Sequence, residues 1–230
     1  MKPFPAGSAG FPRPWLIGFL CAVLLLISST VCAQTVETTL ARSGYSEAHK
    51  DSIIAFFAQI ENDGIPGEML LPKLEEGIAK RVPAPKVLAA LKRESENLQQ
   101  ARELILRIEG GERLLADRAY WARTANLLAT DVSAAEIERL IVLCRTRIEG
   151  FRPASYLYVA MLNWGLSGEP AFDLIATLLA SALPPDSYMG VMDLLATGRR
   201  RRIPPEELIR RIQEHLQHAS TIKELEKWIY

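Results

Sequence analysis

The densest charge in the chain is a run of four arginines, Arg199, Arg200, Arg201 and Arg202, in a connection between two expected helices. A guanidinium group binds carboxylate or phosphate through two donors at once. Arg210 and Arg211 follow in the next helix and could extend the patch to six guanidiniums. Such a patch suits anionic lipid headgroups, polyanionic wall polymers or an acidic protein face. The competing interpretation is a solvated helix corner, because most charge runs face water.

Residues 153–197, just before the arginines, contain no Lys or Arg. The helix expected over Pro153–Trp164 is apolar all round, which predicts a central buried helix. A second interpretation is a partly exposed aromatic groove made by Tyr156, Trp164 and Tyr188. Such a groove would receive a partner helix or an apolar ligand.

Asp193 lies in mid-helix among apolar neighbours, so its carboxylate must be paired, protonated or at the surface. We expect an ion pair with one of the arginines 199–202. The alternative is an enzyme site assembled from Asp193, the arginines and Glu or His residues of other helices. The sequence holds no nucleophile elbow, phosphate loop, Cys-x-x-Cys pair or His-Glu-x-x-His. We therefore assign no catalytic residue.

His215 and His218 stand three positions apart on one expected helix, so both can face one way. Two histidines are half of a metal site, and His49 is remote in sequence. We expect them to be solvated, and we expect neither a metal nor a cofactor. Cys144 ends the apolar stretch Leu140–Cys144, which predicts a buried and inert thiol.

Helices must position these side chains, because no run of alternating β-branched residues predicts a strand. Hydrophobe–proline pairs such as Ile203-Pro204 mark helix starts. Ser133 with Glu136, and Thr221 with Glu224, are capping boxes. Helices are expected near Ser46–Asn62, Gly67–Lys80, Pro85–Glu109, Glu112–Ala129, Ala134–Glu149, Pro153–Trp164, Glu169–Ala182, Pro184–Ala196, Pro204–Gln217 and Thr221–Tyr230.

Two short segments resemble each other: Gly77-Ile-Ala-Lys-Arg-Val-Pro83 and Gly198-Arg-Arg-Arg-Arg-Ile-Pro204. Both hold a glycine, a basic pair, a β-branched residue and a proline. The match could come from two helix corners that obey the same capping chemistry. Gly165 and Gly198 are expected at C′, the position that favours a left-handed residue after a helix.

Helix starts in the second half recur roughly every 15 to 20 residues, so a hairpin takes about 32 to 37, the length of an α-solenoid repeat. We expect an all-α fold of stacked helical hairpins, either an irregular α-solenoid or an orthogonal helical bundle. The tetratricopeptide pattern is not in the sequence. A polar linker is expected over residues 34–45 and a helical domain over 46–230, with possible subdomains 46–130 and 131–230.

The first 33 residues have the pattern of a signal peptide. Lys2 and Arg13 form the positive region, Trp15–Ile27 the apolar region, and Val31 and Ala33 the cleavage site. The apolar region is shorter than the about 20 residues of a membrane span. Two alternatives remain: an uncleaved anchor, and a lipoprotein acylated at Cys32.

The chain carries 27 basic and 27 acidic residues, and loss of Lys2 and Arg13 leaves 25 against 27. This near-neutral charge argues against a nucleic-acid partner. With Cys144 alone left, the mature chain cannot form an internal disulfide, which favours a bacterial envelope.

We therefore expect an exported, non-enzymatic helical interaction or structural module, periplasmic or secreted. Its expected partner is an envelope protein or an anionic envelope surface, and it would meet the membrane only through an uncleaved signal segment. The alternatives are an envelope enzyme and a carrier of an apolar ligand.

Overall fold

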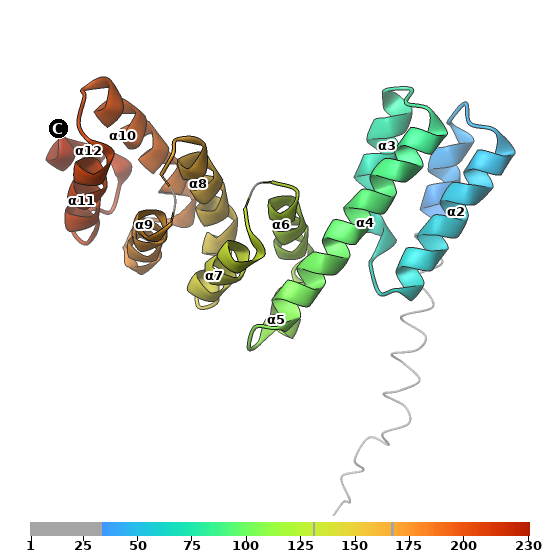
Figure 1. Ribbon diagram of the computed structural model, residues 1–230, viewed down its shortest axis with the longest axis horizontal. Coiled ribbons are helices and arrows are strands. Elements are labelled where there is room, and N and C mark those ends of the chain that lie inside the picture. Colours follow the sequence, from blue (N-terminus) through green and yellow to red (C-terminus); the bar gives the residue numbers. More distant parts are fainter. Residues whose placement is uncertain (1–33, 131, 167) are drawn as a thin grey trace, which may run out of the picture. The chain divides into compact units, whose positions relative to one another are not determined.

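The computed structural model describes residues 34–130, 132–166 and 168–230 (Figure 1). Of these residues 77% are helical, and none lies in a strand. The predicted all-α class is therefore confirmed. The expected signal peptide over residues 1–33 lies outside the described residues.

The chain divides into two compact units between Ser95 and Glu96, inside the long helix α4 (Ala84–Leu106). The sequence suggested a division near residue 130. That position has the turn and capping signals that usually separate domains, whereas the middle of α4 has neither. A boundary within a continuous helix leaves no local signal.

Unit 1 contains a helix over residues 34–41, then α2 (Glu47–Asn62), the 3₁₀ turn η1 (Gly67–Met69), α3 (Leu71–Ala79) and the start of α4. The prediction of a polar linker over residues 34–45 is wrong for residues 34–41, which form this helix. Val36 and Leu40 are each 1% exposed, and their spacing of four places both on one helix face. Their polar neighbours made the segment resemble a linker.

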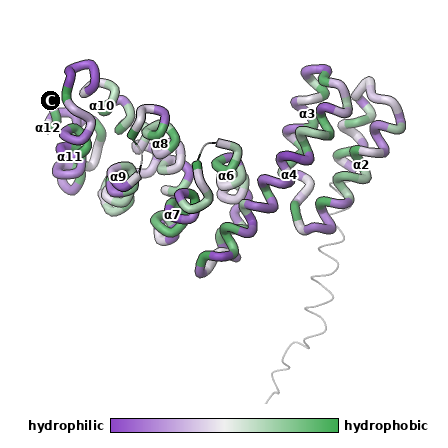
Figure 2. Tube along the Cα trace, in the orientation of Figure 1, coloured by the Kyte–Doolittle hydropathy of each residue, from purple (hydrophilic) through white to green (hydrophobic). Residues whose placement is uncertain are grey.

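Unit 2 begins with the second half of α4 and continues as a succession of shorter helices. They are α5 (Gly111–Ala116), α6 (Arg118–Leu128), α7 (Ala134–Cys144), η2 (Ile148–Gly150), α8 (Phe151–Asn163), α9 (Glu169–Ala180), η3 (Pro185–Ser187), α10 (Tyr188–Arg200), α11 (Pro205–Leu216) and α12 (Ile222–Ile229). Hydrophobic and hydrophilic residues alternate in short stretches along these helices (Figure 2), as in amphipathic helices with one buried face.

The helix α8 is the centre of unit 2, as its apolar sequence predicted. It packs against α6, α7, α9 and α10. Leu157, Tyr158 and Met161 are fully buried, and the Tyr158 hydroxyl donates to Glu136. Burial is not complete all round, because Tyr156 on the same helix is 42% exposed.

Several helix boundaries differ from expectation; for example, the helix expected over Ala134–Glu149 ends at Cys144. The helix expected over Glu112–Ala129 breaks at Asp117, whose carboxylate accepts hydrogen bonds from the backbone N–H groups of Ala119 and Tyr120 and so starts α6. The helix expected over Pro184–Ala196 begins later and continues to Arg200. Both predicted capping boxes are present. In the described part of the chain, no helix has the length and apolar character needed to cross a membrane.

Candidate functional site

A pocket of about 350 Å³ lies in unit 2, where the residues after α8 and the end of α10 meet the start of α11. We call it the Trp164 pocket. Two charged side chains, Arg199 and Arg202, line it. The rest of its wall is apolar: Trp164, Leu166, Leu195, Ile203, Pro204, Pro205 and Leu208.

The backbone after α10 closes in a Schellman motif. Arg202 has a left-handed φ of 60°. The Ile203 N–H donates to the Gly198 carbonyl over 3.0 Å, and the Arg202 N–H donates to the Arg199 carbonyl over 3.0 Å. Pro204 cannot continue a hydrogen-bonded helix and leads into α11. This corner places the exposed Arg202 among the residues that line the pocket.

Gly198 therefore does not occupy C′, and that prediction is wrong. Gly198 lies inside α10, and Arg202 takes the left-handed position instead. The glycine serves close packing: a Cβ there would overlap Leu208 Cδ2 and lie 3.1 Å from Leu208 Cγ. Any larger residue there would force the Leu208 side chain to move, so the glycine reflects the close approach of α10 and α11 in the tertiary structure.

The opposite wall of the pocket comes from the end of α8. Gly165 has a φ of 77°, as expected for C′, and the Leu166 N–H donates to the Met161 carbonyl over 2.9 Å. This turn places Trp164 and Leu166 on either side of Gly165, and both line the pocket. Trp164 is half-buried, so part of its ring remains available.

All four arginines of the run are exposed. The Arg199 guanidinium lies 5.9 Å from the centre of the Trp164 ring, within cation–π range. Arg200 donates to the Thr197 hydroxyl over 2.9 Å, and the Arg201 guanidinium lies 4.3 Å from the centre of the Tyr230 ring. Within residues 34–130, 132–166 and 168–230, none of the four forms an ion pair with a carboxylate.

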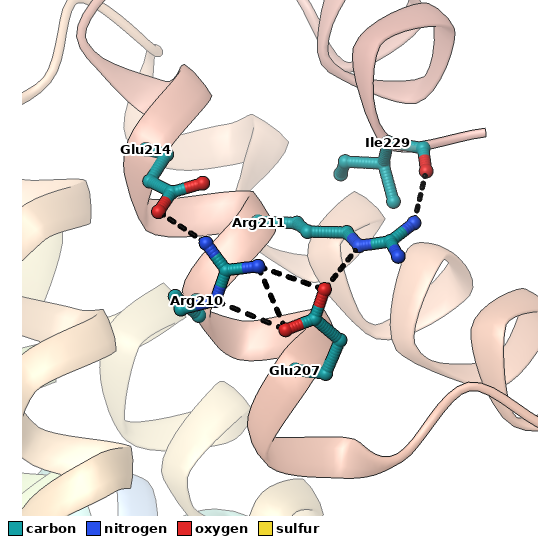
Figure 3. Close-up of polar contacts among 5 residues, drawn as sticks. All are labelled: Glu207, Arg210, Arg211, Glu214 and Ile229. Atoms are coloured by element: carbon teal, nitrogen blue, oxygen red, sulfur yellow. Dashed lines mark hydrogen bonds and ion pairs between the residues drawn. The ribbon is translucent and has the colours of Figure 1, made fainter.

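The predicted extension to six guanidiniums is wrong. Arg210 and Arg211 both bind Glu207, and Arg210 also binds Glu214 (Figure 3). Arg211 further donates to the Ile229 carbonyl over 3.3 Å. The guanidiniums of Arg211 and Arg210 lower the pKa of Glu207. The positive charge of both arginines is thus compensated within α11.

The predicted aromatic groove does not form as a unit. Tyr188 is fully buried at the start of α10, and its hydroxyl donates to the Leu178 carbonyl over 3.1 Å. The Tyr156 ring is covered by the Arg123 guanidinium at 3.8 Å. Trp164 alone lines the pocket, because Tyr156 is eight residues earlier on α8, about 12 Å along the helix axis.

The expected ion pair of Asp193 is also not formed among the described residues. Asp193 is exposed on α10, and Arg199 follows it by six positions, which places the two side chains about 120° apart around the helix. His215 and His218 lie with ring centres 5.5 and 6.4 Å from that of Trp228. No cluster of three or more potential metal ligands occurs in the described ranges.

Cys144 is buried, and burial raises the pKa of its thiol to about 12. Its neutral form therefore dominates at physiological pH, as expected for the buried and inert thiol that the sequence predicted.

Several pocket residues gave no functional signal in the sequence. Leu195 and Leu208 read as ordinary core positions, and only the glycine-to-proline corner pointed to their neighbourhood.

Comparison with known proteins found no matching family model, no similar curated protein and no similar solved structure. The chemistry of the pocket must therefore be read from its own residues. Arginine stays protonated and offers only donors, so Arg199 and Arg202 can bind an anion but cannot exchange protons at neutral pH. The arrangement suits binding of a ligand that has both apolar and anionic parts.

Proposed function

We propose that this chain is an exported, non-enzymatic interaction module of the cell envelope, and that the Trp164 pocket is its binding site. The observation that carries the proposal is the pairing of an apolar wall with Arg199 and Arg202, whose charges no carboxylate of the described chain neutralises. A pocket with fixed hydrophobic surface and a few polar groups is the usual form of a binding site.

The contacts within unit 2 support a stack of helical hairpins resembling an irregular α-solenoid. In unit 2 the strong contacts between α-helices join neighbours or next-but-one neighbours, such as α8 with α10 and α9 with α11. The helices α6 to α12 also follow one another along the unit in chain order (Figure 1). Solenoids have this nearest-neighbour pattern and commonly act as binding scaffolds.

Export is supported by the apolar segment Trp15–Ile27 and the small residues Val31 and Ala33. Intact mass spectrometry of the exported product tests it. We expect a first residue of Gln34. A retained N-terminus, or a lipid adduct on Cys32, would contradict a cleaved signal.

Site-directed photo-crosslinking in the exporting cell tests the binding role. A photoreactive residue replaces either Glu206, which follows the pocket residue Pro205, or Glu226 on α12; both positions are exposed. We expect an adduct of defined mass from position 206 and none from position 226. Adducts from both positions in equal yield, or from neither, would contradict a binding site at the Trp164 pocket.

A further inference from the structure

We infer that the Trp164 pocket takes a segment of a partner protein in which one large apolar side chain is flanked by carboxylates. This inference rests on the proposed function as an interaction module and names the chemistry of its partner. It follows from the volume of the pocket, the apolar residues of its wall and the two arginines that line it.

The volume suits a single anchoring side chain. About 350 Å³ lies at the lower end of the range for ligand pockets, so a leucine or an aromatic ring with its adjoining backbone would fill it. Leu195 and Leu208, each 2% exposed, form part of its wall. A side chain seated against them would lose most of its contact with water, which is the usual setting of an interface hot spot.

The charge of the two lining arginines selects carboxylates as the neighbours of that anchor. Arg199 and Arg202 line the pocket, and the two arginines between them are held by Thr197 and Tyr230. No acidic residue of this chain is among the lining residues. An Asp or Glu beside the anchor would therefore supply the missing negative charge through charge-assisted hydrogen bonds.

Two features favour a peptide over an anionic membrane or wall polymer. The apolar surface is recessed, whereas membrane binding needs apolar side chains that protrude into the lipid. The first turn of α11 carries Glu206 and Glu207 beside Pro205. Glu207 is paired with Arg210 and Arg211, but the Glu206 carboxylate would repel a dense polyanion more than the single carboxylate of a peptide at Arg199 or Arg202.

Selection from a random peptide display library tests the inference, with the exported chain as bait. We expect enriched peptides to contain Leu, Phe or Trp within two positions of Asp or Glu. A synthetic enriched peptide should bind the Arg199→Gln/Arg202→Gln variant and the Trp164→Ala variant at least 10-fold more weakly than the wild-type chain.

The matched control is Arg113→Gln/Arg145→Gln. These two exposed arginines line another pocket in unit 2, which also contains Glu109. The charge change is the same, and we expect the peptide affinity to stay within twofold of wild type. Circular dichroism melting of all variants checks that the fold is retained.

Three results would overturn the inference. Enriched peptides that bind all variants equally would remove the pocket assignment but leave a peptide-binding module. Salt-sensitive sedimentation with anionic vesicles that the Arg199→Gln/Arg202→Gln change abolishes would make a membrane the occupant. No enrichment, together with no adduct from position 206, would refute both the inference and the proposed function.

Discussion

The corner between α3 and α4 in unit 1 and the corner between α10 and α11 in unit 2 are closed by the same hydrogen bonds. We call them the Gly77 corner (Gly77–Pro83) and the Gly198 corner (Gly198–Pro204). In the Gly77 corner Arg81 has a φ of 54°, and the N–H of the next residue donates to the Gly77 carbonyl over 2.9 Å. The Gly198 corner repeats this with Arg202 and Ile203. The resemblance seen in the sequence is therefore a shared capping geometry.

The two corners differ in what surrounds them. At the Gly77 corner the Tyr45 hydroxyl donates to the Val82 carbonyl over 2.8 Å, and Lys80 pairs with Glu76 over 2.6 Å. At the Gly198 corner Trp164 and Leu166 come from the end of α8 and leave a pocket beside the arginines. The same backbone motif is thus a plain structural turn in one place and a candidate binding site in the other.

Alanine at either corner glycine should produce the largest effect. In the Gly77 corner a new Cβ would lie 2.6 Å from Val87 Cγ2, and the stiff β-branched valine cannot turn away. We expect Gly77→Ala and Gly198→Ala each to lower the free energy of unfolding by about 1–3 kcal/mol. Urea denaturation measures this loss of unfolding free energy. Gly44→Ala is the control, because nothing lies within 4 Å of its Cβ position. Losses no larger than that of the control would show that the corners repack freely.

The next largest effect is expected from Tyr45→Phe, which changes the Gly77 corner and leaves the Gly198 corner intact. It removes the hydrogen bond to Val82 and should cost about 0.5–1.5 kcal/mol. Burial raises the pKa of Tyr45 above its ordinary 10.0. The unfolded chain therefore loses this proton at lower pH than the folded chain, and the wild type loses stability as pH rises above 10. We expect the difference between wild type and variant to shrink there. A constant difference in urea denaturation across that pH range would contradict the burial of the hydroxyl.

Glycine at the two left-handed positions should change the stability in the opposite direction. Arg81 and Arg202 both have positive φ, which favours glycine. We expect Arg81→Gly and Arg202→Gly each to leave stability unchanged or raise it by up to about 1 kcal/mol. Only Arg202→Gly should also weaken binding of the selected peptide. Equal weakening by Arg81→Gly would contradict a site specific to the Gly198 corner.

The smallest effect is expected from Glu207→Gln. This change removes an acidic residue from the first turn of α11, whereas the first turn of α4 has no acidic residue. Arg211 and Arg210 lower the pKa of Glu207, so its contribution is present above the ordinary glutamate pKa and is lost as pH falls through the lowered value. Because the pair is exposed, melting at neutral pH should change little. The difference between wild type and variant should vanish in acid. A stability difference that persists in acid would show that the substitution acts through lost packing and not through the lost ion pairs.

Most helices of unit 2, and the presence of a helix corner at Gly77–Pro83 and at Gly198–Pro204, could be predicted because their signals are local. The capping boxes at Ser133 and Thr221 and the residues of each corner make hydrogen bonds within a few positions of themselves. The division inside α4 and the helix over residues 34–41 could not be predicted in this way. Each depends on which apolar faces pack together, as the buried Val36 and Leu40 illustrate.

By itself the sequence determined an all-helical chain with two matching corners and an arginine run in the second of them. Only the tertiary structure decided which of its side chains are available. It buried Tyr188, covered Tyr156 with Arg123 and joined Arg210 and Arg211 to Glu207. It also brought Trp164 beside Arg199. The reason is physical: a cap is completed within one helical turn, whereas a pocket is the space left when segments far apart in sequence pack together.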